Sequence, residues 1–117
     1  MFKSIASFLI VSALALAADV AGKWTASFDT QIGTQTYTYE FKVDGEKLTG
    51  TAKSASGESQ ITEGSVKGDK ISFVEQLTFQ DMPLRIVYTG TLKGDEIKFT
   101  RDVAGLAMED LVAKRVK

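Results

Sequence analysis

The sequence contains no cysteine and no histidine among its 117 residues. The absence of cysteine excludes disulfide bonds and thiolate nucleophiles, and the absence of both excludes zinc sites of the usual Cys/His kind. Without histidine there is neither an axial haem histidine nor a Ser-His-Asp triad. Most enzyme signatures are therefore missing, and we expect no catalytic residues, no metal and no cofactor.

An excess of basic charge is missing as well. Fourteen Lys and Arg residues face fifteen Asp and Glu residues, which leaves a net charge of -1. Nucleic acids and anionic lipids attract proteins with a clear basic surplus. The charge balance therefore predicts no nucleic-acid partner.

The chain also lacks an apolar run long enough for a membrane-spanning helix, which needs about 20 residues. Its apolar segment over residues 5–16 is shorter, follows Lys3, and ends at the small-x-small pattern Ala15-Leu16-Ala17. This predicts a secretory signal peptide over residues 1–17 rather than a stable membrane anchor. We expect residues 18–117 to form one domain that is exported to the periplasm or outside the cell, and that is held by core packing and strand pairing alone.

The remaining sequence shows no convincing helical period. Apolar and polar residues alternate along it instead. Tyr37, Tyr39, Phe41 and Val43 are separated by polar residues, as in a strand with one buried and one solvated face. The same argument predicts eight strands, over residues 22–32, 34–44, 46–53, 58–66, 70–79, 84–92, 96–102 and 110–116. The connection from Val103 to Leu111 is predicted to form a single turn or a flap.

Three segments repeat one turn pattern, in which a polar residue precedes a glycine, an acid follows, and apolar residues flank both sides. They occupy residues 43–48, 66–71 and 92–97. Glycine adopts positive φ without steric cost, so each segment predicts a tight hairpin. The intervals of about two strands place the three turns at one end of the sheet, and longer loops are expected at the other end, over residues 54–58, 80–83 and 102–109.

Eight consecutive antiparallel strands favour closure, because an open sheet leaves two unpaired edges. We therefore predict an all-β fold, an antiparallel up-and-down eight-stranded barrel, with a β-sandwich as the alternative. Gly50, Gly64 and Gly90 lie inside predicted strands and indicate bulges or tight bends there.

Gly22-Lys23-Trp24, at the start of the first predicted strand, resembles the Gly-x-Trp signature of lipocalins and their calycin relatives. The resemblance implies that Trp24 closes one barrel end and packs beneath a basic side chain of the last strand. Arg115 is the first candidate and Arg101 the second. The chain also resembles small exported bacterial β-barrel domains with repeated Gly-Asp/Glu hairpins.

The barrel interior is the candidate binding site. Most aromatic residues share the inward parity, and they either fill a simple core or line a small apolar pocket at the long-loop end, with tyrosine hydroxyls orienting a ligand. Two charges, Glu75 and Arg101, share the apolar parity. Either they pair with each other or other charges, or a bulge turns them outward, or Arg101 receives a ligand carboxylate. The candidate ligand-binding residues are Tyr37, Tyr39, Glu75, Tyr88 and Arg101, and Glu63 and Arg85 are further polar candidates.

These observations favour an exported non-catalytic protein that binds a small apolar or amphipathic ligand in the barrel mouth. One alternative is a protein-interaction module, such as an exported enzyme inhibitor, that presents the loops at 80–83 or 104–108 with Leu106 and Met108. A second alternative is a carbohydrate-associated accessory domain. The inward parity of the aromatic residues disfavours the second alternative, because sugar rings stack on exposed aromatics.

Overall fold

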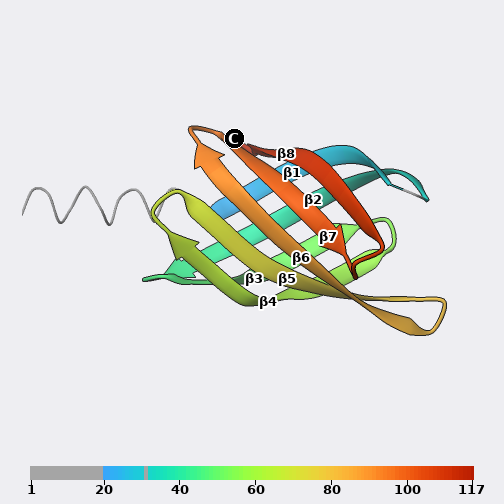
Figure 1. Ribbon diagram of the computed structural model, residues 1–117. Coiled ribbons are helices and arrows are strands. Elements are labelled where there is room, and N and C mark those ends of the chain that lie inside the picture. Colours follow the sequence, from blue (N-terminus) through green and yellow to red (C-terminus); the bar gives the residue numbers. More distant parts are fainter. Residues whose placement is uncertain (1–19, 31) are drawn as a thin grey trace, which may run out of the picture.

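The computed structural model describes residues 20–30 and 32–117, so the predicted signal peptide lies outside the described residues. These residues form a closed antiparallel barrel in which each strand pairs with its neighbours in sequence and β8 returns to β1 (Figure 1). The strands are β1 (Gly22–Thr30), β2 (Gly33–Asp44), β3 (Lys47–Ser54), β4 (Gly57–Lys67), β5 (Lys70–Phe79), β6 (Met82–Lys93), β7 (Glu96–Val103) and β8 (Ala107–Arg115). The predicted up-and-down barrel is confirmed, and the sandwich alternative is wrong. Within the described part of the chain, no helix is long and apolar enough to cross a membrane.

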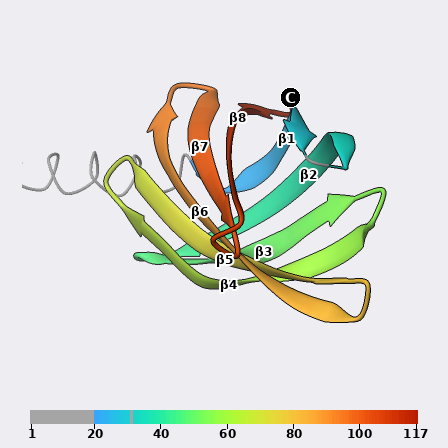
Figure 2. The ribbon, with the colours of Figure 1, turned by 45° about the vertical axis from the view of Figure 1, so that its right-hand side comes forward.

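The three predicted tight hairpins are confirmed. Gly45, Gly68 and Gly94 each have φ near +60° at the tips of the β2–β3, β4–β5 and β6–β7 turns. Backbone hydrogen bonds join neighbouring turns, from the Val66 amide to the Glu46 carbonyl and from the Leu92 amide to the Asp69 carbonyl. The three turns therefore lie side by side at one end, which we call the tight-turn end (Figure 2).

The prediction of longer loops at the opposite end is wrong. There β5 and β6 are joined by Gln80 and Asp81 alone, both at positive φ (52° and 65°), and β8 begins already at Ala107. Of the two forms expected for the connection after Val103, a single turn or a flap, the structure has the single turn, which spans residues 104–106. The β5–β6 turn is not evident from the sequence, because Gln80 and Asp81 rather than glycine adopt the left-handed conformation that a two-residue hairpin needs.

Two of the three strand glycines mark irregular pairing. The β3–β4 register shifts between Leu48 and Gly50, and the β4–β5 register shifts between Thr62 and Ser65, around Gly64. Gly90 has another role, because its pairing with Phe99 is regular. A Cβ atom at Gly90 would lie 2.5 Å from Cδ1 of Phe99, so its missing side chain makes room for that ring.

The core fills the barrel between the two ends with inward-facing side chains of all eight strands. At the tight-turn end, Trp24 is fully buried, and its indole nitrogen donates a hydrogen bond to the Val20 carbonyl (2.9 Å). The Arg115 guanidinium lies over the indole, 4.4 Å from its centroid, and Arg115 also pairs with Asp95. The predicted Trp24–Arg115 contact is confirmed, and Arg101 lies elsewhere in the interior.

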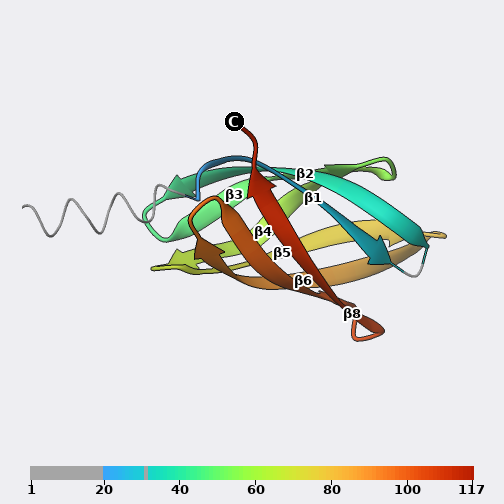
Figure 3. The same cartoon turned by 90° about the horizontal axis from the view of Figure 1, so that it is seen from above.

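The pairing between β1 and β8, which closes the barrel, extends over only a short part of both strands. Among the described residues, the register of β1 with β8 comprises two pairs, Trp24 with Arg115 and Thr25 with Lys114, and one further backbone hydrogen bond runs from the Val116 amide to the Lys23 carbonyl. Beyond them the strands diverge toward the end opposite the tight turns (Figure 3). A hollow of about 920 Å³ opens there, which we call the seam hollow. It is lined by residues 25–29 of β1, 98–100 of β7, and 110–112 and 114 of β8.

Candidate functional site

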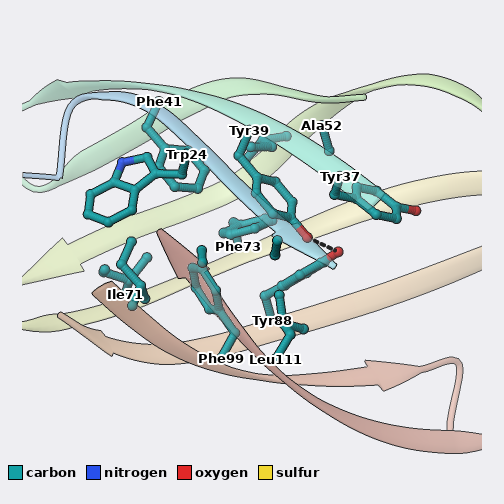
Figure 4. Packing of buried hydrophobic residues seen from close by; sticks show 14 of the residues in the cluster. Trp24, Tyr37, Tyr39, Phe41, Ala52, Ile71, Phe73, Tyr88, Phe99 and Leu111 are labelled. Carbon is teal, nitrogen blue, oxygen red and sulfur yellow. Dashed lines mark hydrogen bonds between the residues drawn. The ribbon is translucent and has the colours of Figure 1, made fainter. Parts of the chain in front are cut away.

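The barrel interior is a continuous array of aromatic rings (Figure 4). Phe73 stacks on Tyr88 with ring centroids 4.3 Å apart, and Phe99 meets both rings edge-on. Tyr39 lies against Tyr88 at 5.7 Å and against Phe41 at 5.8 Å. This packing occupies the middle of the barrel, so space for a ligand must lie nearer its periphery.

A hydrogen-bonded network crosses the interior on the side away from Trp24. The Tyr88 hydroxyl donates to Oε1 of Glu75 (2.9 Å) and accepts from Nε of Arg101 (2.9 Å). Because a hydroxyl has a single proton, the 2.9 Å contact between Tyr39 and Tyr88 requires Tyr39 to donate. Nη2 of Arg101 donates to the Tyr37 hydroxyl (3.1 Å). All five residues predicted as ligand-binding therefore belong to one network, which we call the polar cluster together with Glu109.

Arg101 lies between two carboxylates. Its Nη2 is 3.6 Å from Oε1 of Glu75, and its Nη1 donates to Oε1 of Glu109. Three aromatic rings also surround the guanidinium, with Phe28 and Tyr37 at 5.3 and 5.2 Å from their centroids and Tyr88 at 5.6 Å. The expectation that Glu75 and Arg101 point inward and pair is confirmed. With both acids ionised, the polar cluster has one more negative than positive charge.

Burial shifts the titration of the acid and phenol groups. Glu75 is 1% exposed, and desolvation raises its pKa above the ordinary value although Arg101 and Tyr88 favour its ionised form. Burial, with Glu75 nearby, raises the pKa of Tyr37 to about 12. The tyrosines therefore remain neutral hydrogen-bonding groups at physiological pH.

One polar atom of the cluster is unsatisfied. Oε2 of Glu75 is buried and has no hydrogen-bond partner among the described residues. A buried acceptor without a donor is costly, and native proteins rarely retain one without a reason. This oxygen is the point of the cluster at which a donor from a ligand or a water molecule has most to gain.

Phe28 connects the polar cluster to the seam hollow. Its ring contacts the Arg101 guanidinium and stacks on Tyr37, with centroids 5.6 Å apart, and the same residue lines the hollow beside Leu111. The seam hollow therefore combines an apolar floor with a charged rim that includes Lys98 and Asp110. It lies beside the polar cluster, on the open side of the barrel.

Sequence reasoning missed Glu109 because the last strand was expected to begin only at residue 110. Glu109 shares the inward parity of Leu111 and Ala113, and that parity is the signal that would have found it. Glu63 and Arg85, named as further polar candidates, lie on the outer surface. They form a bidentate pair at 2.7 and 2.9 Å and do not join the cluster.

The cluster presents hydrogen-bonding groups to its surroundings. One acid of raised pKa beside a paired arginine offers no nucleophile activated by a second base. Among the described residues, no group of three or more acidic side chains is placed to hold a metal ion. No protein-family model, curated protein sequence or solved structure matches this chain.

Proposed function

We propose that this chain is an exported, non-catalytic binding protein of calycin-like architecture whose ligand is a small amphipathic molecule. The observation that carries the proposal is the unsatisfied Oε2 of Glu75 within a buried network that contacts Phe28, a lining residue of the seam hollow. Polar groups inside an apolar core lower stability unless they are fully paired. Buried polar groups next to a hollow that has apolar lining residues are the arrangement that a ligand site requires.

The ligand's apolar part would lie against Phe28 and Leu111 in the seam hollow. Its polar part would reach toward the polar cluster. Because Arg101 already faces Glu75 and Glu109, the cluster favours a hydrogen-bond donor, such as a hydroxyl or an amine, over a third carboxylate. The ligand would enter between the diverging strands β1 and β8. It would not enter through the barrel mouth, as the sequence suggested, because the packed rings fill the middle of the barrel.

The test combines ligand detection with a plug in the hollow. Native mass spectrometry of protein purified from its exporting host is expected to show a bound mass that denaturation removes. Ser27 is exposed and lines the seam hollow, so Ser27→Trp is expected to lower the occupancy severalfold without disturbing the core. The matched control is Thr49→Trp on the outer face of β3. Absence of any bound mass, or equal loss in both variants, would contradict the proposal.

A protein-interaction module is the second candidate, and one observation favours it. Leu106 and Met108 at the β7–β8 turn are 75% and 67% exposed. Leu106 lies in the turn and Met108 at the start of β8, and exposed apolar side chains that lie close together are a common feature of protein contacts. Alanine at both positions is expected to abolish capture of a protein partner, and unchanged capture would exclude this turn.

A further inference from the structure

The middle one of the three repeated hairpins differs from the other two in the charges of the residues that close it. The residues that close each hairpin lie directly opposite each other in the register. The closing pairs are Asp44–Lys47, Lys67–Lys70 and Lys93–Glu96. Opposite charges face each other in the first and third hairpins, whereas two lysines face each other in the second. Like charges directly opposite each other destabilise a sheet, so this pair needs a reason other than stability.

The lysine pair is the beginning of a row that crosses the outer face of four strands. Lys70 of β5 is opposite Thr91 of β6, and Thr91 is opposite Lys98 of β7. A second row runs parallel to it, two residues farther along each strand. This hydroxyl row consists of Ser65, Ser72, Thr89 and Thr100, each opposite the next.

Both rows line one hollow of about 520 Å³, which we call the basic groove. Lys67, Lys70 and Lys98 line it, and no acidic side chain is among its lining residues. In the part of the chain that the structure describes, none of the three lysines forms an ion pair within 4 Å. The one hydrogen bond recorded for their ammonium groups is from Lys70 to the Thr91 hydroxyl, at 3.2 Å.

We propose that the basic groove binds an acidic polysaccharide, a chain of sugar rings with carboxylate or sulfate groups. The lysines supply charge-assisted donors for the anionic groups. The hydroxyl row both donates and accepts hydrogen bonds, which matches the hydroxyl groups of sugars. No aromatic side chain lines the groove, so neither sugar rings nor nucleobases stack there, and recognition must come from charge and hydroxyl contacts. This disfavours single-stranded nucleic acid, whose bases would remain unstacked.

The strand spacing sets the distance between the anionic groups. Lys70 and Lys98 are two strands apart, which corresponds to about 10 Å between their backbone positions. A polymer with charges at intervals can therefore engage both lysines at once, whereas a single small anion contacts one end of the row. Simultaneous engagement gives a polymer more affinity than separate ions have. The groove adjoins the seam hollow, and Lys98 and Thr100 line both. The proposal does not rest on the small-ligand site, because Lys67 and Lys70 line the groove alone.

The internal repeat supplies the test variant. Lys67→Asp gives the middle hairpin the Asp–Lys pair that the first hairpin has at Asp44 and Lys47. We expect Lys67→Asp to weaken binding of heparin or polygalacturonate at least about fivefold, with elution from a heparin column at lower salt. The same variant is expected to unfold at an equal or higher temperature, because it removes a repulsive pair. Lys98→Gln, at the other end of the row, is expected to weaken binding in the same direction.

The matched control is Lys42→Asp, which changes the net charge equally on the exposed face of β2, outside the groove. It is expected to bind heparin within about twofold of the wild-type affinity. Equal weakening by Lys42→Asp would overturn the proposal, because binding would then follow net charge alone. Unchanged binding by Lys67→Asp would overturn it too. So would equally tight binding of single-stranded DNA, or equal stabilisation by inorganic sulfate at the same concentration of anionic groups.

Discussion

At the scale of single residues, Arg101 is the centre of the hydrogen-bond network inside the barrel. The guanidinium donates to two tyrosine hydroxyls and to Glu109, and it lies 3.6 Å from Glu75. The strand period placed Glu75 and Arg101 on the inner face, because a two-residue period needs no knowledge of the partner strand. Their mutual distance depends on how far neighbouring strands shift in register, and no local pattern encodes that shift.

Glu75 makes stability depend on pH in a direction that can be tested. Burial raises the pKa of Glu75 in the folded protein above its ordinary value of 4.5, so the folded state binds more protons than the unfolded state just above that pH. The contribution of Glu75 to the free energy of unfolding therefore falls as pH rises from 4.5 through the raised pKa. The Glu75→Gln variant has no carboxyl group at this position, so its unfolding free energy does not fall for this reason. Its stability relative to the wild type is therefore expected to increase as pH rises from 4.5 through the raised pKa, and urea denaturation between pH 4 and 8 measures it.

Glu63→Gln is the control for this prediction. The exposed carboxylate of Glu63 accepts two hydrogen bonds from Arg85, which lowers its pKa. Its stabilising contribution is present above its unfolded pKa and is lost as pH falls, so Glu63→Gln is expected to lose stability relative to the wild type as pH rises through the acid range. Parallel pH profiles for the two variants would show that burial does not govern Glu75.

At the scale of elements, the local pattern predicts strands better than it predicts turns. The strand over residues 70–79 has the predicted bounds, and the three glycine turns lie where the repeat placed them. The prediction of longer loops at the opposite end was wrong because Gln80 and Asp81 form a two-residue turn without glycine. Ala104, in the β7–β8 turn, also has a positive φ. Tertiary pairing of the long β5–β6 hairpin imposes a conformation that these residues do not prefer, and a propensity argument cannot anticipate this.

That turn is a place where stability can be gained. Asp81 adopts φ of 65°, a conformation that costs residues with a Cβ about 1–2 kcal/mol. Asp81→Gly removes the steric cost and adds some entropy to the unfolded chain, so a net gain of about 0.5–1 kcal/mol in unfolding free energy is expected. Thermal unfolding followed by circular dichroism measures it.

Asp69→Gly is the matched control for the turn. Asp69 follows Gly68 in the β4–β5 turn, and its own φ is not positive. The same chemical change is therefore expected to lower stability there, because only the entropic cost of glycine remains. Stabilisation by both substitutions, or by neither, would mean that the positive φ of Asp81 carries no strain.

At the scale of the whole molecule, closure is strong at one end and weak at the other. At the tight-turn end, the Trp24 indole, the Arg115 guanidinium and the Asp95 carboxylate join β1, β8 and the β6–β7 turn. Beyond Thr25 and Lys114 the register pairing of β1 with β8 stops. The sequence indicated closure because eight strands avoid free edges by closing, but the extent of the last pairing follows from strand tilt and shear, which are properties of the complete barrel.

Hydrogen exchange can map this incomplete closure residue by residue. Backbone groups alternate in direction along a strand, and the Val116 amide bonds the Lys23 carbonyl across the seam. The amides of Ser27 and Asp29 therefore face β8, whereas those of Ala26 and Phe28 face β2, with which they pair in register. We expect the two seam-facing amides to exchange at least about tenfold faster than their two neighbours, because only the neighbours have strand partners. Equal protection along β1 would show that the seam closes in solution, and the route proposed for the ligand would then be absent.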